Sequence, residues 1–333
     1  MASQMPAPPA LLELVKEHKA SIMAIACARD GSQWASANIG GLVLCRSLEG
    51  TSPLRVLGPV HAGVGVHSLA YSPDGAKLAV GDGLGTISIY STATRERLSQ
   101  WRDGHHAAVV ALAWAPDAGG THVLSGSRGG PLCCWDTATN ALENAPIVVP
   151  GGACVLAFSP DGSQFVVGGG QGRLTLWNAK TGTRVQCEGH TECILSVAYA
   201  PDGKELASVA QDNTLRCWDT SSGRCLNQST PPFAPTAVAY SPSGKDLLIG
   251  DARGMLQRWK TFAAEPGLAA SALFCPAVSI GHGCLPCHAG VVNAIAYAPD
   301  GDFVFTGSQD GSIGVWLGES QAVSRARPVD VDF

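Results

Sequence analysis

One short string, C-L-P-C-H at residues 284–288, carries residue types and a spacing that could do chemistry. C-x-x-C-H is the attachment signal for c-type haem. The first residues, MASQMPAPPALLELVKEHK, lack both the basic start and the long apolar run of a secretory signal. Without export, covalent attachment of haem is not expected, and we predict no cofactor.

The same region offers ligands for a zinc ion. Structural zinc takes four tetrahedral Cys or His ligands, and a firm sequence signature needs two C-x-x-C pairs, whereas this chain has one. An ordinary cysteine-containing loop is therefore the favoured interpretation, and zinc is the alternative. Most of the 12 cysteines lie in apolar runs, where a free thiol behaves as a small buried side chain in a reducing compartment. The possible zinc ligands are Cys275, His282, Cys284 and Cys287.

These residues belong to a chain that repeats itself. A turn of the form (S/A)-P-D-G, or a close variant, occurs seven times. Five of the six steps between copies are 41 to 44 residues long, and the last is 57. A period of about 40–45 residues is that of one four-stranded propeller blade. The third residues of the turns are Asp30, Asp74, Asp117, Asp161, Asp202, Ser243 and Asp300.

Two further markers run in phase with the turns. A short apolar run such as VHSLAYS precedes each turn, and a run such as GTISIY or NTLRCW ends about fifteen residues after it. These runs alternate apolar and polar residues, as pleated strands do. The sequence therefore predicts an all-β fold, a single seven-bladed β-propeller of four-stranded antiparallel blades. The later runs end at Cys45, Tyr90, Trp135, Trp177, Trp218, Trp259 and Trp316.

The two ends of the repeat array predict how the ring closes. No fourth strand follows Trp316, whereas residues 11–16 (LLELVK) form a spare strand before the first repeat. We expect this N-terminal strand to join the last blade, because closure removes exposed sheet edges. The propeller then spans residues 11–319, with an insertion at about 263–287 that explains the long step. Residues 1–10 and 320–333 are expected to be flexible tails.

In-phase Trp-Asp pairs at 135–136 and 218–219, and Gly-His pairs at 104–105 and 189–190, resemble the WD-repeat family over nearly the whole chain. The resemblance implies that a His, a Ser or Thr, an Asp and the Trp form a hydrogen-bonded network that braces a blade. The histidines in it are expected to be structural rather than metal ligands or catalytic bases. The matching residues are His190, Ser208, Asp212 and Trp218 in one blade, and His288, Thr306, Asp310 and Trp316 in another.

The other five blades depart from this pattern. The blade with His105, Ser125 and Trp135 has Gly129 where the Asp belongs. The remaining four blades are expected to depend on apolar packing alone. They carry Ala35, Val80, Val167 and Ile249 at the Ser/Thr place, and Ile39, Leu84, Gln171 and Arg253 at the Asp place.

The turns after the second strand of each blade are the expected binding surface, because in the resembling family they lie on one rim beside the Gly-His loops. Arginine is favoured at interface hot spots, and apolar residues in such turns suit a protein partner, although single exposed apolar residues are also ordinary. The predicted rim residues are Asn38, Ile39, Leu84, Arg128, Gln171, Arg253 and Gln309.

Composition and charge narrow the function. A net charge of −5 excludes the basic field that nucleic-acid binding needs, no run of about 20 apolar residues suits a membrane helix, and no catalytic constellation stands out. We expect a non-catalytic protein-interaction scaffold, monomeric by itself, with other proteins as partners. We expect it in the cytoplasm, with a cytoskeletal, ciliary or nuclear assembly as further options. The alternative is a substrate-receptor subunit of a ubiquitin ligase, for which W-N-A-K at 177–180 only weakly resembles the expected Trp-Asp-x-Arg ending.

Overall fold

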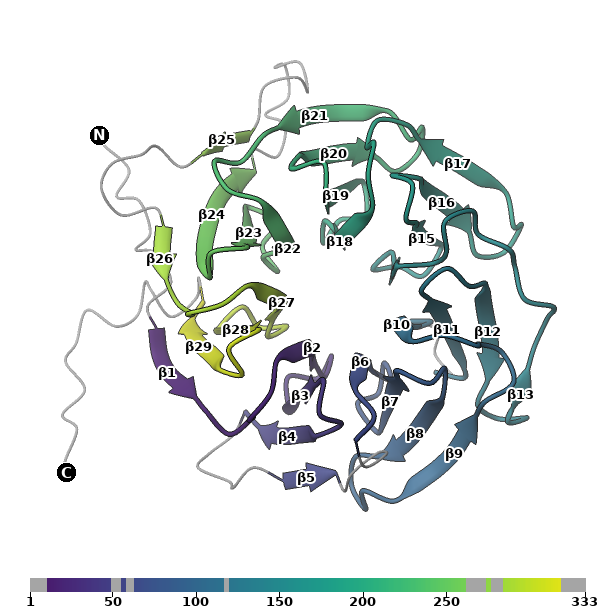
Figure 1. Cartoon of the computed structure of the whole chain (residues 1–333). Coiled ribbons are helices and arrows are strands. Elements are labelled where there is room, and N and C mark those ends of the chain that lie inside the picture. The colour runs from purple at the N-terminus through teal and green to yellow at the C-terminus, as the bar shows by residue number, and fades with distance from the viewer. Residues whose placement is uncertain are drawn as a thin grey trace, which may run out of the picture.

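The computed structural model describes residues 11–48, 55–57, 63–116, 120–261, 274–276 and 284–318. In this part of the chain every regular element is a β-strand, and no helix is long and apolar enough to cross a membrane. The strands form seven antiparallel sheets arranged as blades around a central opening (Figure 1). This confirms the predicted all-β, seven-bladed propeller; the two predicted tails lie outside the described residues. Blades are numbered 1 to 7 in chain order, starting from the sheet that contains β2.

Each blade begins with an innermost strand beside the opening and continues outward. The innermost strands are β2 (Ile22–Cys27), β6 (Val66–Tyr71), β10 (Val109–Trp114), β14 (Val155–Phe158), β18 (Ile194–Tyr199), β22 (Pro235–Tyr240) and β27 (Val292–Tyr297). The second strands are β3 (Gln33–Asn38), β7 (Lys77–Asp82), β11 (His122–Ser127), β15 (Gln164–Gly168), β19 (Glu205–Ala210), β23 (Asp246–Asp251) and β28 (Phe303–Ser308).

The third and outer strands complete the blades. The third strands are β4 (Val43–Ser47), β8 (Ile87–Ser91), β12 (Leu132–Asp136), β16 (Leu174–Asn178), β20 (Leu215–Asp219), β24 (Met255–Thr261) and β29 (Ile313–Leu317). The outer strands of blades 1 to 5 are β5 (Arg55–Leu57), β9 (Arg97–Trp101), β13 (Ala141–Leu142), β17 (Arg184–Cys187) and β21 (Cys225–Ser229).

Blade 6 differs from the predicted four-stranded pattern because its outer edge is divided. β25 (Phe274–Pro276) pairs with the end of β24, and β26 (Cys284–Pro286) pairs with its start. The two short strands together cover the length of β24 that one outer strand covers elsewhere. The outer edge of blade 6 is therefore formed by two separate strands, and residues 262–273 and 277–283 lie outside the described part of the chain.

The N-terminal strand closes the ring, as predicted. β1 (Leu11–Val15) pairs antiparallel with β29, with Leu11 opposite Trp316 and Val15 opposite Ile313. Val15 is 4% exposed and belongs to an apolar cluster that joins blade 7 to blade 1. The first and last described strands are thus held in one blade by both hydrogen bonds and packing.

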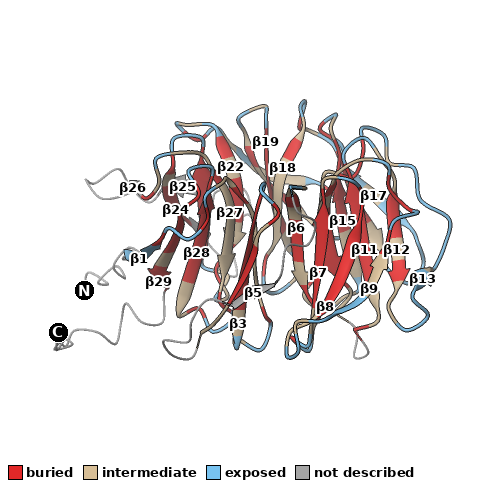
Figure 2. Cartoon of the chain, turned by 60° about the horizontal axis from the view of Figure 1, so that its bottom comes forward, coloured by how far each residue is buried: buried red, intermediate tan, exposed pale blue. Residues whose placement is uncertain are grey.

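The core lies between neighbouring blades. In one cluster Val43 and Cys45 of blade 1 pack with Leu69 and Tyr71 of blade 2, and similar clusters recur around the ring. Figure 2 shows the buried residues along the strands and many of the exposed ones at the two ends, where the turns lie. The propeller therefore presents two faces of turns on a packed ring.

Candidate functional site

The turns after the second strands are fixed to the loops that lead into the innermost strands. In each blade a turn amide donates a hydrogen bond to a carbonyl just before the innermost strand. This repeated bond joins the two kinds of loop into one continuous rim, called the rim surface below. The seven bonds run from Ile39 to Ser21, Gly83 to Gly65, Arg128 to Ala108, Gly170 to Gly151, Gln211 to Cys193, Ala252 to Ala234 and Gln309 to Val291, at 2.8–3.1 Å.

Six of the seven predicted rim residues have exposed side chains. Ile39 is 48% exposed and Leu84 is 68% exposed. Asn38 is the exception at 3%, because its Oδ1 accepts hydrogen bonds from the amides of Gly40 and Leu42 inside the turn. Asn38 therefore holds the turn and is not part of the surface that a partner could touch, which corrects the prediction. The exposed six are Ile39, Leu84, Arg128, Gln171, Arg253 and Gln309.

Four of these residues come from consecutive blades, and we call Ile39, Leu84, Arg128 and Gln171 the blade 1–4 sector. Glycines lie between them. A Cβ added at Gly65 would lie 2.9 Å from the Ile39 carbonyl oxygen, and one at Gly151 would lie 3.3 Å from Cγ of Gln171. The glycines let the loops pack closely and leave backbone close to the surface.

Sequence reasoning missed one member of this region. Val148, in the loop between β13 and β14, is 83% exposed. The apolar run I-V-V-P at 147–150 was a signal for it, because a solvated loop seldom needs three apolar residues in a row. Val148, with Ile147 beside it at 37% exposed, adds to the exposed aliphatic side chains on the side of the ring that holds the sector.

The two exposed rim residues outside the sector, Arg253 and Gln309, lie on blades 6 and 7. The Arg253 guanidinium carbon lies 3.9 Å from the centre of the Phe233 ring. A cation stacked on an aromatic face is held in place by the ring quadrupole. Gln309 is exposed in the turn of blade 7. Arg128 and Arg253 are thus separated along the ring by two intervening blades and do not form one patch.

The bracing residues of blade 5 form a continuous chain of hydrogen bonds. Trp218 Nε1 donates to Ser208 Oγ at 2.8 Å, and Ser208 Oγ lies 2.8 Å from His190 Nε2. His190 Nδ1 lies 2.9 Å from Asp212 Oδ2. Since a carboxylate only accepts, Nδ1 carries the proton and Nε2 accepts from the serine. Burial lowers the pKa of His190, and Asp212 opposes this, so the ring is neutral and has no spare lone pair for a substrate.

Blade 7 uses one more residue than the sequence predicted. His288 Nε2 lies 2.8 Å from Thr306 Oγ1, which also accepts from Trp316 Nε1 at 3.0 Å. His288 Nδ1, however, lies 2.7 Å from Ser312 Oγ and 3.9 Å from Asp310 Oδ1. Ser312 donates to Asp310 at 2.5 Å, so the carboxylate braces the histidine through a hydroxyl.

Blade 1 contains a partial network, and its residues lie one position further along the chain than the sequence pattern predicts. His18 Nε2 lies 2.8 Å from Ser36 Oγ, and Ser36 is the fourth residue of its second strand, as Ser208 is in blade 5. The Ser/Thr place is therefore Ser36 and not Ala35, and the Asp place is Gly40 and not Ile39. The Trp place is Arg46, not Cys45. The separation of 18 residues, shared with His190–Ser208, was the available signal.

Two histidines belong to bracing networks that lack the Asp. In blade 3, His105 Nε2 lies 2.6 Å from Ser125 Oγ, which accepts from Trp135 Nε1 at 2.7 Å. Among the described residues, Nδ1 of His105 and Nδ1 of His18 are buried and have no hydrogen-bond partner. Burial lowers the pKa of both histidines to about 4. Both rings are therefore neutral near pH 7.

Blades 2 and 6 do not depend on apolar packing alone, contrary to the prediction. Asp82, at the end of β7, accepts hydrogen bonds from the amides of Leu84 and Thr86 at 2.9 and 2.8 Å. Asp251 does the same in blade 6 for Arg253 and Met255. Both carboxylates are buried. Each carboxylate lies at the end of the second strand and stabilises the following rim turn, as the side chain of Asn38 does in blade 1.

The candidate zinc residues are only partly described. The thiol of Cys287 donates to the Gly254 carbonyl at 2.9 Å, and burial raises its pKa to about 12. A thiol in this state is a poor metal ligand, because zinc binds the thiolate. The side chains of Cys275, His282 and Cys284 lie outside the described residues. No group of three or more possible ligands occurs among the residues that are described.

We expect Ser208→Ala to lower the free energy of unfolding by about 2–3 kcal/mol. The change leaves Trp218 Nε1 and His190 Nε2 buried without a partner, and each loses the hydrogen bond that offset its desolvation. Urea unfolding followed by tryptophan fluorescence measures the loss. Ser221→Ala, on an exposed turn, is the control and should cost less than about 0.5 kcal/mol. Equal effects of the two changes would show that the network adds nothing.

Gly40→Asp is expected to complete the network of blade 1. The new carboxylate would accept from His18 Nδ1, raise the pKa of His18 and add about 0.5–1.5 kcal/mol of stability. Gly40 has no left-handed φ, and an added Cβ meets Asn38 Oδ1 at 3.3 Å, so a small adjustment of Asn38 suffices. Histidine NMR titration and urea unfolding give the two readouts.

Gly129→Asp is the matched control in blade 3. Gly129 has φ +71°, a conformation that costs any L side chain energy, so the same chemical addition should bring no gain. A pKa of His18 that stays unchanged in Gly40→Asp would show that Asp does not reach Nδ1.

A known family model matches four of the repeats in this chain. Four segments match the family model described as WD domain, G-beta repeat: residues 51–91, 151–178, 182–219 and 281–316. A chain in a crystal structure of a mitotic checkpoint complex superposes with a TM-score of 0.80, covering 96% of this chain and 99% of that one at 22% identity. At this identity the likeness supports the fold alone.

Three curated relatives share parts of the propeller. The WD repeat-containing protein slp1 of Schizosaccharomyces pombe is 29% identical over 44% of this chain and 30% of its own length. Actin-interacting protein 1 of Drosophila melanogaster is 28% identical over 57% and 32%. Cell division cycle 20.4, cofactor of APC complex, of Arabidopsis thaliana is 32% identical over 40% and 32%. The chain thus spans about a third of the length of these relatives.

Proposed function

We propose that this seven-bladed propeller, four segments of which match the WD-repeat family model, is a non-catalytic scaffold that holds partner proteins against its rim surface. The ring is packed between all neighbouring blades, so the loops at its rim keep fixed relative positions. A rigid surface of this kind binds without a large ordering cost. The proposal includes the cytoplasmic location expected from the sequence.

The observation that carries the proposal is the blade 1–4 sector. Ile39 and Leu84 expose apolar side chains, and Arg128 follows them in the next blade. An apolar patch with a nearby arginine matches interface cores, which are more apolar than the rest of a protein surface and are enriched in arginine. The glycines between them allow a partner to approach the backbone closely.

The histidines support a scaffold over an enzyme. The side chains of His190 and His288 are fully buried and each ring nitrogen faces a Ser, Thr or Asp partner. A general base must come within hydrogen-bond reach of a substrate, and these two do not reach the surface. They are used to brace the blades.

The descriptions of two relatives also support a role in binding other proteins. One is described as an actin-interacting protein and another as a cofactor of the APC complex. Both descriptions place a related propeller among other proteins. Fold likeness alone does not give function, so the partner of this chain must be found by experiment.

The test is quantitative affinity purification from the source cell with wild type and with Leu84→Asp/Arg128→Glu. We expect specific partners to fall by about tenfold or more, because hot-spot losses reach 2 kcal/mol. Leu98→Asp is the matched control, since Leu98 is another exposed leucine, at 54% against 68% for Leu84, and lies on β9, away from the rim. Partners that are lost equally in the control, or kept in the double variant, would remove the sector from the proposal.

A substrate-receptor subunit of a ubiquitin ligase is the second candidate. The similarity to a cofactor of the APC complex favours it. Ligase subunits among the purified partners, together with substrates that accumulate when this chain is depleted, would support this role. Partners without any ligase subunit would leave the plain scaffold.

A further inference from the structure

We propose that the face opposite the rim holds a second binding site, a pocket at the channel mouth that takes an acidic side chain next to an apolar one from an extended peptide of a partner protein. The innermost strands start at the rim and end at this opposite face. The pocket lies where the innermost strands of blades 1 to 4 end, and its volume is about 230 Å³. A space of this size accepts a pair of neighbouring side chains and leaves the rest of a ligand outside.

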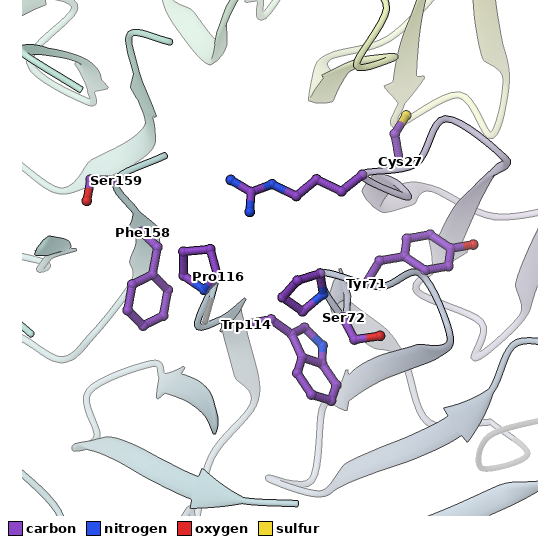
Figure 3. A pocket seen from close by; sticks show the side chains of 9 residues that line it. Cys27, Tyr71, Ser72, Trp114, Pro116, Phe158 and Ser159 are labelled. Carbon is purple, nitrogen blue, oxygen red and sulfur yellow. The ribbon is translucent and has the colours of Figure 1, made fainter. Parts of the chain in front are cut away.

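Aromatic and proline rings form the apolar part of the pocket lining, beside polar groups such as Ser72 and Ser159. Trp114 and Pro116 of blade 3 and Phe158 of blade 4 line it, and Tyr71 and Pro73 of blade 2 complete it. Figure 3 shows Cys27 and Phe158 on opposite sides, with Pro116 between Phe158 and Trp114. Trp114 Nε1 already donates to the Ala70 carbonyl, and the residue is 6% exposed, so it contributes only a small apolar surface to the pocket.

Among the described lining residues one is charged, and it occupies the turn position where every other blade has a proline. The second turn residue is Arg29 in blade 1, and the turn forms without proline, since Gly31 N donates to the Ala28 carbonyl at 3.0 Å. The arginine is therefore not required by the turn. The corresponding prolines are Pro73, Pro116, Pro160, Pro201, Pro242 and Pro299.

The guanidinium of Arg29 reaches across the mouth of the channel. Its Nη2 donates to the Pro160 carbonyl of blade 4 at 3.0 Å, and these two blades are not neighbours in the ring. Within the described chain this is its one hydrogen bond, and it goes to a neutral acceptor. An arginine has five N–H donors in a fork that matches a carboxylate, so most of its donors remain available to a ligand.

Among the described residues that line the pocket there is no carboxylate to pair with Arg29. The nearby turn acids are used by their own turns: Asp30 accepts from Ser32, Asp74 from Ser72 and Asp161 from Ser159. None of the three lines the pocket. Their charges around the mouth favour a ligand with one negative charge over a phosphate with two. The combination of one cation with aromatic walls therefore selects Asp or Glu beside Phe, Leu or Trp.

The experiment selects a random 12-residue peptide phage library on the immobilised wild-type protein and measures the enriched peptides by calorimetry. The key variant is Arg29→Pro, which removes the cation and restores the residue of the other six turns, so the fold should be kept. Arg29→Lys keeps the charge but not the fork. Leu84→Asp changes only the rim surface, which separates this site from the proposed function.

We expect enriched peptides with an acid next to an aromatic residue or leucine. Their Kd should rise by about tenfold or more in Arg29→Pro, by less in Arg29→Lys, and not in Leu84→Asp. Three results would overturn the proposal. They are that no peptide is enriched over the blank support, that the peptides bind Arg29→Pro as tightly as wild type, or that they bind Leu84→Asp more weakly than wild type. The last would place them on the rim.

Discussion

Val15→Asp is expected to lower the free energy of unfolding by about 4 kcal/mol or more. Val15 is buried in the cluster that joins blade 7 to blade 1, with Ile22, Trp34, Phe305 and Ile313 around it. The change removes apolar contact and places a carboxylate among apolar side chains. Such a loss is a large part of the 5–15 kcal/mol that usually stabilises a protein. Urea unfolding measures it directly.

Leu12→Asp is the matched control for this prediction. Leu12 lies on the same strand but is 47% exposed, so the same type of substitution should cost less than about 0.5 kcal/mol. A similar loss for both variants, or no loss for either, would show that β1 does not close the ring through its buried residue.

Stability is expected to fall steeply as the pH drops from about 6.5 to about 4. Burial lowers the pKa of His18 and His105 to about 4 in the folded protein, while the unfolded chain has the ordinary value near 6.5. Between these values the unfolded state binds more protons, so the contribution is complete above 6.5 and is lost as the pH falls. Each histidine should cost about 2 kcal/mol at pH 5 relative to pH 7.5.

Urea unfolding at a series of pH values from 7.5 to 5 measures this loss. In His18→Gln/His105→Gln the dependence should shrink by about 4 kcal/mol over that range, while His67, His190 and His288, whose pKa values burial also lowers, keep a smaller slope. Turn acids such as Asp74 and Asp161 have lowered pKa values, with hydrogen bonds as the main cause, so they act below this window. A double variant with the full wild-type slope would contradict the assignment.

The architecture could be predicted because it depends on local, repeated signals. The Pro-Asp-Gly turns, the alternating strands and the spare strand at residues 11–16 each state a short-range preference, and seven copies reinforce one another. The same regularity explains the error in blade 1. That blade has Arg29 instead of proline and Arg46 instead of tryptophan, so the markers that fix the register were weakest there.

The candidate sites could be predicted only in part because they depend on contacts between blades. Asn38 and Ile39 are adjacent, yet one is buried in the turn and the other faces solvent, a difference of one residue that the pattern does not resolve. The bond from Arg29 to the Pro160 carbonyl joins residues 131 positions apart. Likewise, Ser312 stands between His288 and Asp310 because of the exact turn geometry.

The central claim is that the rim surface of blades 1 to 4 binds a partner protein. Placing the photo-crosslinking residue p-benzoyl-phenylalanine at position 84 in cells tests it most directly. Position 98 on β9 is the control, because it is also exposed but lies away from the rim. We predict ultraviolet-dependent covalent adducts of defined mass from position 84 and none from position 98. Adducts from neither position, or the same adducts from both, would contradict the claim.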